Sequence, residues 1–279
     1  MSVGPPRGEP GAATSGRWAD LVPRFGAASV LAALSLAAMW VGGWPFRLMI
    51  VAICAVILWE LARMLTRAAS PQHWGEPALV LSALGGAALG LAFLLPPGFA
   101  LPLLFAPAMA AISILPRNRT VFIPFCVLVL LAGYGVAALR LDYGFAWLAW
   151  LAAVVIVTDV FGYFAGRLIG GPKFWPRVSP KKTWAGTVAG WIASGIVGLG
   201  YVLWLDAGIE LVGISVAISM ASQMGDIAES AVKRKMGVKD SSSLLPGHGG
   251  LFDRFDGMLG AAILLLVVDA VSDFPPPPL

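Results

Sequence analysis

The sequence predicts an all-α, polytopic integral membrane protein with about nine transmembrane helices and a cytoplasmic N-terminus. Apolar residues make up 58% of the 279 residues and charged residues only 12%, which is too little charge for the surface of a soluble domain of this size. The apolar residues form long unbroken runs, without the period-two alternation of membrane-spanning strands. Because every backbone polar group in hydrocarbon must be satisfied internally, such runs fold as helices.

Nine segments are apolar over a length that can enter a bilayer. They cover residues 25–43, 46–65, 77–95, 98–115, 120–139, 144–169, 184–205, 209–226 and 256–273. The prolines and glycine at 96–98 predict a tight hairpin between the third and fourth segments. Residues 24–274 are therefore predicted to form one membrane-embedded domain. The polar leader 1–23 and the Pro-rich tail 275–279 are expected to lack fixed structure, and no secretory signal peptide is expected.

The distribution of Lys and Arg predicts the orientation, because these residues avoid translocated loops. With a cytoplasmic N-terminus, every Lys and Arg except Arg47 and Arg140 falls on the cytoplasmic side of the nine segments. The two richest polar loops, 170–183 and 227–255, then lie on that same face. The sequence thus predicts a multi-pass protein whose site faces the cytoplasm.

Acidic residues cluster where the eighth and ninth segments meet the polar loop between them. Asp226, Glu229 and Ser230 share one helical face, and Asp253 and Asp256 are three residues apart at the start of the last segment. Carboxylates at the mouths of two neighbouring helices suit a hard cation such as Mg²⁺, whose coordination shell is completed by substrate phosphates. The alternative is ion pairing with nearby cations, which are Lys233, Arg234 and Arg254.

A glycine-rich turn and several cations lie between these acids. Gly249 and Gly250 allow backbone amides to approach an anion closely. His248 is a candidate for hydrogen bonding to a phosphate oxygen or for proton transfer. The cations that could hold a triphosphate, or instead only meet anionic lipid, are Lys233, Arg234, Lys235 and Lys239.

A second polar cluster precedes the seventh segment. Ser179 and Thr183 are candidate helix caps, and Lys181 and Lys182 beside the helix N-terminus would attract phosphate. Trp184 is either part of this cluster or an ordinary interfacial anchor.

Asp159 lies within the sixth segment and requires a partner there. Gly162, Tyr163 and Gly166 share its helical face, and the glycines allow close helix packing. A polar contact between packed helices is the alternative interpretation. Glu60, in the second segment, is interpreted as a boundary residue and is given no role.

The stretch from Ser230 to Asp256 resembles the signature of phosphatidate cytidylyltransferases (CDP-diacylglycerol synthases). The matching parts, whose spacing also fits, are Ser230 to Arg234, Lys239-Asp240, Pro246 to Gly250 and Asp253 to Asp256. The Ser-Pro-Lys-Lys-Thr-Trp cluster and the segment around Asp159 are similar to other blocks of that family. The resemblance covers residues 155–260. One position departs from the pattern, because Ala185 stands where the family usually has Glu.

The resemblance implies transfer of the cytidylyl group of CTP to phosphatidic acid, giving CDP-diacylglycerol and pyrophosphate for phospholipid biosynthesis. It also implies Mg²⁺ with a second cation, contact with membrane lipids, a homodimer in a bacterial inner membrane, and no nucleic-acid partner. Asp226 and Asp253 would hold the metal and act in catalysis together with His248, Lys233 and Arg234. The residues that would bind CTP or the lipid phosphate are Ser179, Lys181, Lys182, Thr183, Asp159, Tyr163, Ser230, Lys239, Asp240, Gly249, Gly250, Arg254 and Asp256.

Two other functions remain as alternatives. A CTP-dependent kinase or related transferase acting on an isoprenoid lipid alcohol would share a similar membrane core but release CDP. A transporter would use Asp159 and the polar loops as an ion path, although no paired broken segments indicate inverted repeats. The chain has no P-loop, kinase signature, HExxH motif or GxSxG elbow, so the nucleotide-binding templates of water-soluble enzymes do not apply.

Overall fold

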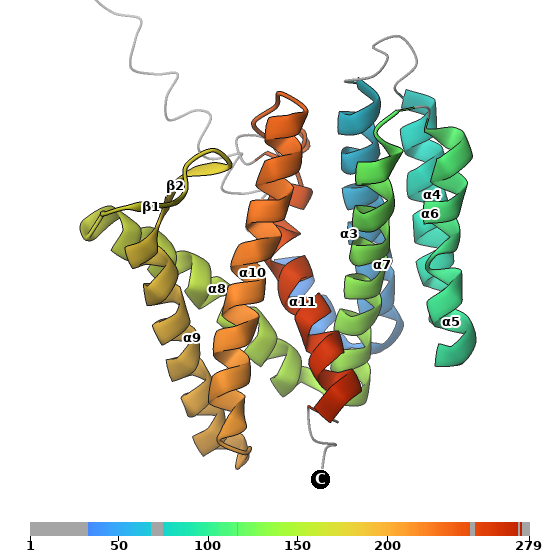
Figure 1. Cartoon of the computed structure of the whole chain (residues 1–279). Helices are drawn as coiled ribbons and strands as arrows, with labels where there is room; N and C mark the ends of the chain where they lie inside the picture. The colour runs from blue at the N-terminus through green and yellow to red at the C-terminus, as the bar shows by residue number, and fades with distance from the viewer. Residues whose placement is uncertain (1–32, 68–74, 116, 246–248, 273, 275–279) are drawn as a thin grey trace, which may run out of the picture.

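The computed structural model describes residues 33–67, 75–115, 117–245, 249–272 and 274, which form a helical bundle with one small sheet (Figure 1). The helices are α3 (Gly43–Arg67), α4 (Gly75–Ala92), α5 (Pro97–Leu103), α6 (Ala106–Ile114), α7 (Arg119–Asp142), α8 (Phe145–Leu168), α9 (Trp184–Leu205), α10 (Glu210–Lys235) and α11 (Phe252–Ser272). Within the described residues, seven helical stretches are long and apolar enough to cross a membrane, one of them formed by α5 and α6 together over Pro97–Ile114. The predicted polytopic all-α fold is confirmed.

The count of nine spans and the cytoplasmic N-terminus stay predictions. The first predicted segment, 25–43, lies partly outside the described residues, and its described part is helical over 33–41. The leader 1–23 and the tail 275–279 lie wholly outside them. The fourth predicted segment is divided into α5 and α6, because Pro107 in the first turn of α6 lacks an N–H for a continuous helix.

The predicted ends of the last two spans were wrong, and the error concerns the acidic residues. The eighth segment was expected to end at residue 226, but α10 continues to Lys235. It continues because Ile227 and Val232 remain buried on its inner face, so the helix is amphipathic beyond the apolar run. The helix α11 likewise begins at Phe252 instead of 256. Asp226 therefore lies well inside α10, on the helical face predicted for it with Glu229 and Ser230, and Asp253 lies in the first turn of α11.

The helix α11 joins the two halves of the bundle. In Figure 1 it lies between α10 on one side and α3 and α7 on the other. The core around it is formed by fully buried apolar side chains, including Leu58, Leu61, Phe122 and Trp150. The second half is built from α8, α9 and α10, which pack against one another along their lengths.

Glycines bring the helices of the second half into backbone contact. A Cβ atom at Gly186 of α9 would overlap the carbonyl oxygen of Gly162 of α8. A Cβ atom at Gly225 of α10 would overlap the carbonyl oxygen of Asp256 of α11, and would lie 3.1 Å from the backbone nitrogen of Gly260. Small residues at such positions let helix axes approach closely, as predicted for the Asp159 face.

The polar loop before α9 forms a hairpin of β1 (Lys173–Trp175) and β2 (Ser179–Thr183). The strands are antiparallel, with Lys173 opposite Thr183 and Trp175 opposite Ser179. Thr183 Oγ1 caps α9 by accepting a hydrogen bond from the Gly186 amide at 3.2 Å, as predicted. The capping role of Ser179 was wrong, because the strand places it away from the helix end.

Candidate active site

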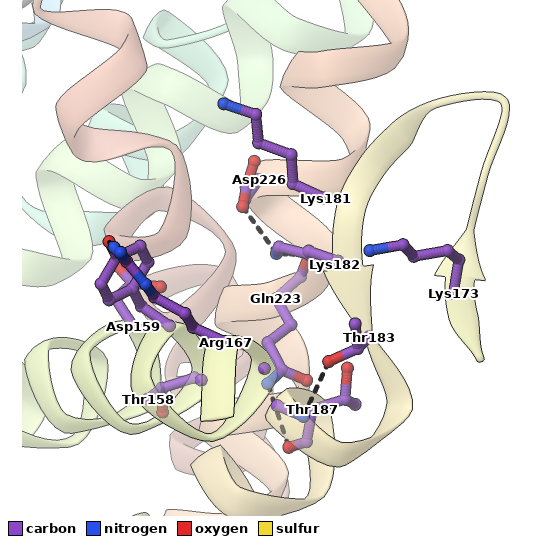
Figure 2. Close-up of a pocket in the computed structure, with 14 residues that line it drawn as sticks. Thr158, Asp159, Arg167, Lys173, Lys181, Lys182, Thr183, Thr187, Gln223 and Asp226 are labelled. Atoms are coloured by element: carbon purple, nitrogen blue, oxygen red, sulfur yellow. Dashed lines mark hydrogen bonds and ion pairs between the residues drawn. The ribbon is translucent and has the colours of Figure 1, made fainter. Parts of the chain in front are cut away.

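A cavity of about 460 Å³ lies where α8, α9, α10 and the β-hairpin meet (Figure 2). The glycines of α8 and α9 leave this space free of side chains, while polar groups come from all sides. Six of the predicted site residues line it: Asp159, Tyr163, Lys181, Lys182, Thr183 and Asp226. Three segments that the sequence marked separately are therefore brought to one site.

An ion pair joins the hairpin to α10 at this cavity. Lys182 Nζ lies 2.6 Å from Asp226 Oδ2, with side-chain exposures of 23% and 30%, and Figure 2 shows the two groups facing each other. Lys182 Nζ also donates to the Gln223 carbonyl oxygen at 3.4 Å. Ser230 Oγ donates to Asp226 Oδ1 at 3.2 Å. Because the pair is partly withdrawn from water, its attraction is less screened than that of a surface pair.

Three carboxylates converge beside the cavity in what we call the acidic cluster: Asp226, Glu229 and Asp256. One oxygen of each lies within 4.8 Å of the others. Glu229 is fully buried, and its Oε2 pairs with the Lys233 ammonium at 2.5 Å, whereas its Oε1 has no hydrogen-bond partner among the described residues. A buried carboxylate oxygen without a donor favours a bound cation, and an all-oxygen set fits Mg²⁺.

Asp253 lies next to the acidic cluster and has its own donors. Its Oδ1 accepts from Lys233 Nζ at 2.6 Å. Its Oδ2 accepts from the Ser241 amide at 2.9 Å, the Ser241 hydroxyl at 2.9 Å and the Gly250 amide at 2.7 Å. Lys233 thus bridges Glu229 and Asp253, so the predicted alternative of ion pairing is confirmed for this lysine. Asp253 thus binds both ends of the segment 241–252, which we call the signature loop.

Other predicted residues lie elsewhere in the described part of the chain. Lys239 and Asp240 line a separate cavity of about 560 Å³ together with Arg63 of α3. Arg234 is exposed and donates to the Val238 carbonyl oxygen at 3.2 Å, beyond the end of α10. Arg254 is exposed at the first turn of α11. Gly249 has a φ of +81°, which favours glycine.

Two further predictions concern residues outside this cavity. Ser179, at the start of β2, is not among the residues that line it. His248 lies outside the described residues.

Several cavity residues were not predicted. Thr158, Arg167, Lys173, Thr187 and Gln223 also line the space. Gln223 is one helical turn before Asp226, and Arg167 is one turn after Tyr163, so helical spacing from predicted residues would have found both. Lys173 is brought to the cavity by the β-hairpin, which no pattern of residues predicted.

Glu60, interpreted from the sequence as a boundary residue and given no role, has specific partners in the structure. Its side chain is fully buried in the bundle. Its oxygens accept hydrogen bonds from Ser241, Ser242, Leu251 and Phe252 in the signature loop. The residue therefore links the first half of the chain to the candidate site.

Comparison with known proteins extends the match over both halves of the chain. The sequence profile of the cytidylyltransferase family matches residues 22–271. The phosphatidate cytidylyltransferase of Brucella suis biovar 1 is 34% identical over 268 residues, which cover 93% of this chain and 97% of that protein. The phosphatidate cytidylyltransferase of Staphylococcus saprophyticus is 39% identical over 165 residues, which cover 56% of this chain and 63% of that protein. With its polar signature set on membrane helices, this chain belongs to the cytidylyltransferase family.

Proposed function

We propose that this protein transfers the cytidylyl group of CTP to phosphatidic acid and so makes CDP-diacylglycerol and pyrophosphate. The observation that carries the proposal is the cavity in which lysines of the β-hairpin meet Asp226 of the acidic cluster. Lysine side chains, which bind phosphates, and carboxylate oxygens, which bind Mg²⁺, then face the same bound substrate. The names of the relatives support this choice of substrates, and no observation favours the isoprenoid-lipid kinase over it.

The reaction needs no covalent enzyme intermediate. An oxygen of the lipid phosphate forms a bond to the α-phosphorus of CTP, and the bond from that phosphorus to the β-phosphate oxygen breaks. Lys173, Lys181 and Lys182 bind the phosphates and hold attacking and leaving oxygens in line. Asp226 and Asp253 would hold Mg²⁺, with Glu229 and Asp256 of the acidic cluster offering further oxygens beside them. The bound ion would supply charge neutralisation to the reacting phosphates.

The remaining predicted residues have supporting roles in this proposal. Lys233 keeps Glu229 and Asp253 in place and offsets their charge. Tyr163, Thr183 and Asp159 shape the cavity wall. His248, Arg234 and Arg254, with Lys239 of the second cavity, bind the anionic groups of CTP or of the lipid. Asp240 of the same cavity binds the substrate as a hydrogen-bond acceptor.

The membrane position follows the substrates. CTP comes from the cytoplasm, and phosphatidic acid enters from the inner leaflet between helices. The Lys and Arg distribution supports a cytoplasmic site, and the bacterial relatives support an inner bacterial membrane. A homodimer and a second cation belong to the same proposal and rest on the family resemblance.

The test uses the purified full chain with Mg²⁺, phosphatidic acid and CTP labelled at either the α- or the γ-phosphate. We expect α-label in the lipid and γ-label in pyrophosphate. Lipid-borne γ-label with an isoprenoid alcohol acceptor would instead identify a kinase. Absence of transfer to either acceptor would contradict the proposal.

A lysine variant tests the role of the cavity. Lys182→Met should lower kcat/KM for CTP by about 10²-fold, because a charge-assisted hydrogen bond to a phosphate contributes about 1.5–3 kcal/mol. Lys182→Arg keeps the charge and should recover most of the activity. Steady-state rates at varied CTP measure both variants. A Met variant within threefold of the unsubstituted protein would remove Lys182 from the site.

A further inference from the structure

We propose that Glu60 of α3 is the positioning residue that sets the first turn of α11, and with it Asp253 and Asp256. This inference rests on the proposed function, because those two acids act there on Mg²⁺ and CTP. Glu60 lies in the half of the chain that carried no predicted site residue. Its relative exposure is 0%, and a buried carboxylate is tolerated only where its oxygens are satisfied.

The oxygens of Glu60 lie within hydrogen-bond distance of four groups from one short segment, one of which, the Ser241 hydroxyl, has a single hydrogen that it shares with Asp253. Its Oε1 accepts from the Ser242 hydroxyl at 2.6 Å and the Leu251 amide at 2.9 Å. Its Oε2 accepts from the Phe252 amide at 2.7 Å and the Ser241 hydroxyl at 3.1 Å. The two amides belong to the start of α11, where N–H groups lack partners within the helix and a negative charge is favoured. Glu60 therefore caps a helix that begins 192 positions later.

The same segment connects Glu60 to Asp253. The Ser241 hydroxyl lies 3.1 Å from Glu60 Oε2 and 2.9 Å from Asp253 Oδ2. The Ser241 and Gly250 amides also donate to Asp253. The two carboxylates thus hold the signature loop from opposite sides, and displacing one displaces the donors of the other.

The space at Gly250 is set by Glu60. A Cβ atom at Gly250 would lie 2.6 Å from Glu60 Oε1 and would overlap the Ser241 hydroxyl. A glycine is needed there because the buried carboxylate occupies the space of a side chain, whereas Gly249 is required by its positive φ. The need for glycine at position 250 therefore depends in part on Glu60, a residue far outside the signature.

The donors of the signature loop, and not the packing of α3, explain why a carboxylate stands at position 60. Its neighbours Leu58, Leu61 and Leu65 on α3 are fully buried without any polar group, so apolar side chains suffice to pack this helix. A glutamine in place of Glu60 has one acceptor oxygen and turns an NH₂ group toward an N–H or hydroxyl donor. The first turn of α11 would then shift, and Asp256 would move relative to the other acids of the acidic cluster.

The experiment compares Glu60→Gln and Glu60→Asp with the matched control Glu76→Gln, whose glutamate is exposed in the first turn of α4. The full chain in detergent is titrated with MgCl₂, and two quantities are measured. The first is the Mg²⁺ concentration at which the melting temperature has risen by half of its total increase. The second is the Mg²⁺ concentration that gives half-maximal turnover. We expect Glu60→Gln to need roughly tenfold more Mg²⁺ in both, with kcat lowered roughly tenfold, as for residues that support metal ligands. Glu60→Asp should fall between, and Glu76→Gln should match the unsubstituted protein.

Other outcomes overturn the inference. A folded Glu60→Gln variant with Mg²⁺ dependence within twofold of the unsubstituted protein excludes a positioning role, and a lower melting temperature alone reduces Glu60 to a packing contact. If Glu60→Gln does not fold, Ser241→Ala removes only the hydroxyl between Glu60 and Asp253. It should need about threefold more Mg²⁺, and an unchanged requirement overturns the inference. Failure of the proposed function appears separately, as absent lipid labelling by the unsubstituted protein, and the melting readout needs no turnover.

Discussion

Asp226→Asn and Asp253→Asn should each lower cytidylyl transfer by about 10³-fold or more while the protein stays folded in detergent. Each substitution removes one negative charge and one anionic ligand from the proposed Mg²⁺ site. Metal ions contribute several kcal/mol of charge stabilisation to such transfers, and about 4 kcal/mol corresponds to that factor in rate. The measurement is the initial rate of α-label incorporation into lipid, with melting temperature and gel filtration as checks on folding.

The matched control is Asp206→Asn. Asp206 ends α9 with a φ of +52°, a conformation that asparagine also adopts readily. We expect its rate to equal that of the unsubstituted protein. If either Asp226→Asn or Asp253→Asn retained a near-normal rate with the control unchanged, the metal-holding role of that aspartate would be wrong.

Gly225→Ala should push α10 away from α11 and lower both the stability and the activity of the protein. The added methyl would overlap the Asp256 carbonyl oxygen and lie 3.1 Å from the Gly260 nitrogen. The helices α10 and α11 would have to separate, which costs about 1–3 kcal/mol for an overpacked contact. It also moves Asp226 away from Asp256, and a shift of about 1 Å in such a site costs about 10²-fold in rate.

Gly213→Ala is the matched control for Gly225→Ala on the same helix, α10. Nothing lies within 4 Å of a Cβ atom at Gly213, so neither the melting temperature nor the rate should change. Both variants are followed by thermal melting and by transfer rate. A Gly225→Ala protein that melts and turns over like Gly213→Ala would show that the backbone contact does not hold the acids together.

Hydropathy predicted the helices well and their polar ends badly. The segment 184–205 coincides with α9, because its ends coincide with a capping threonine and a polar turn. The helix α10 runs past its apolar stretch since a helix that emerges from the bilayer can keep one buried face while its other positions become charged. Length and hydrophobicity cannot mark the end of such a helix.

The site was predictable where its residues share a helix and not where distant segments meet. The face from Asp226 to Ser230 followed from spacing, and their hydrogen bond bears it out. The pairing of Lys182 with Asp226 required the fold of the β-hairpin onto α10. Glu60 was missed for a different reason. Two of its partners are backbone amides, and every residue except proline has one, so no side-chain pattern marks them.

Glu60 and the helix that it caps are synthesised at different times. Translation produces Glu60 192 residues before Phe252, so the carboxylate reaches the membrane boundary long before its two amide donors exist. Without donors it favours water over the bundle interior, and the end of α3 should stay hydrated until the last helix arrives. Insertion of α11 then both completes the acidic cluster and withdraws this carboxylate from water. An unfinished chain would therefore expose to water an acid that the finished protein buries.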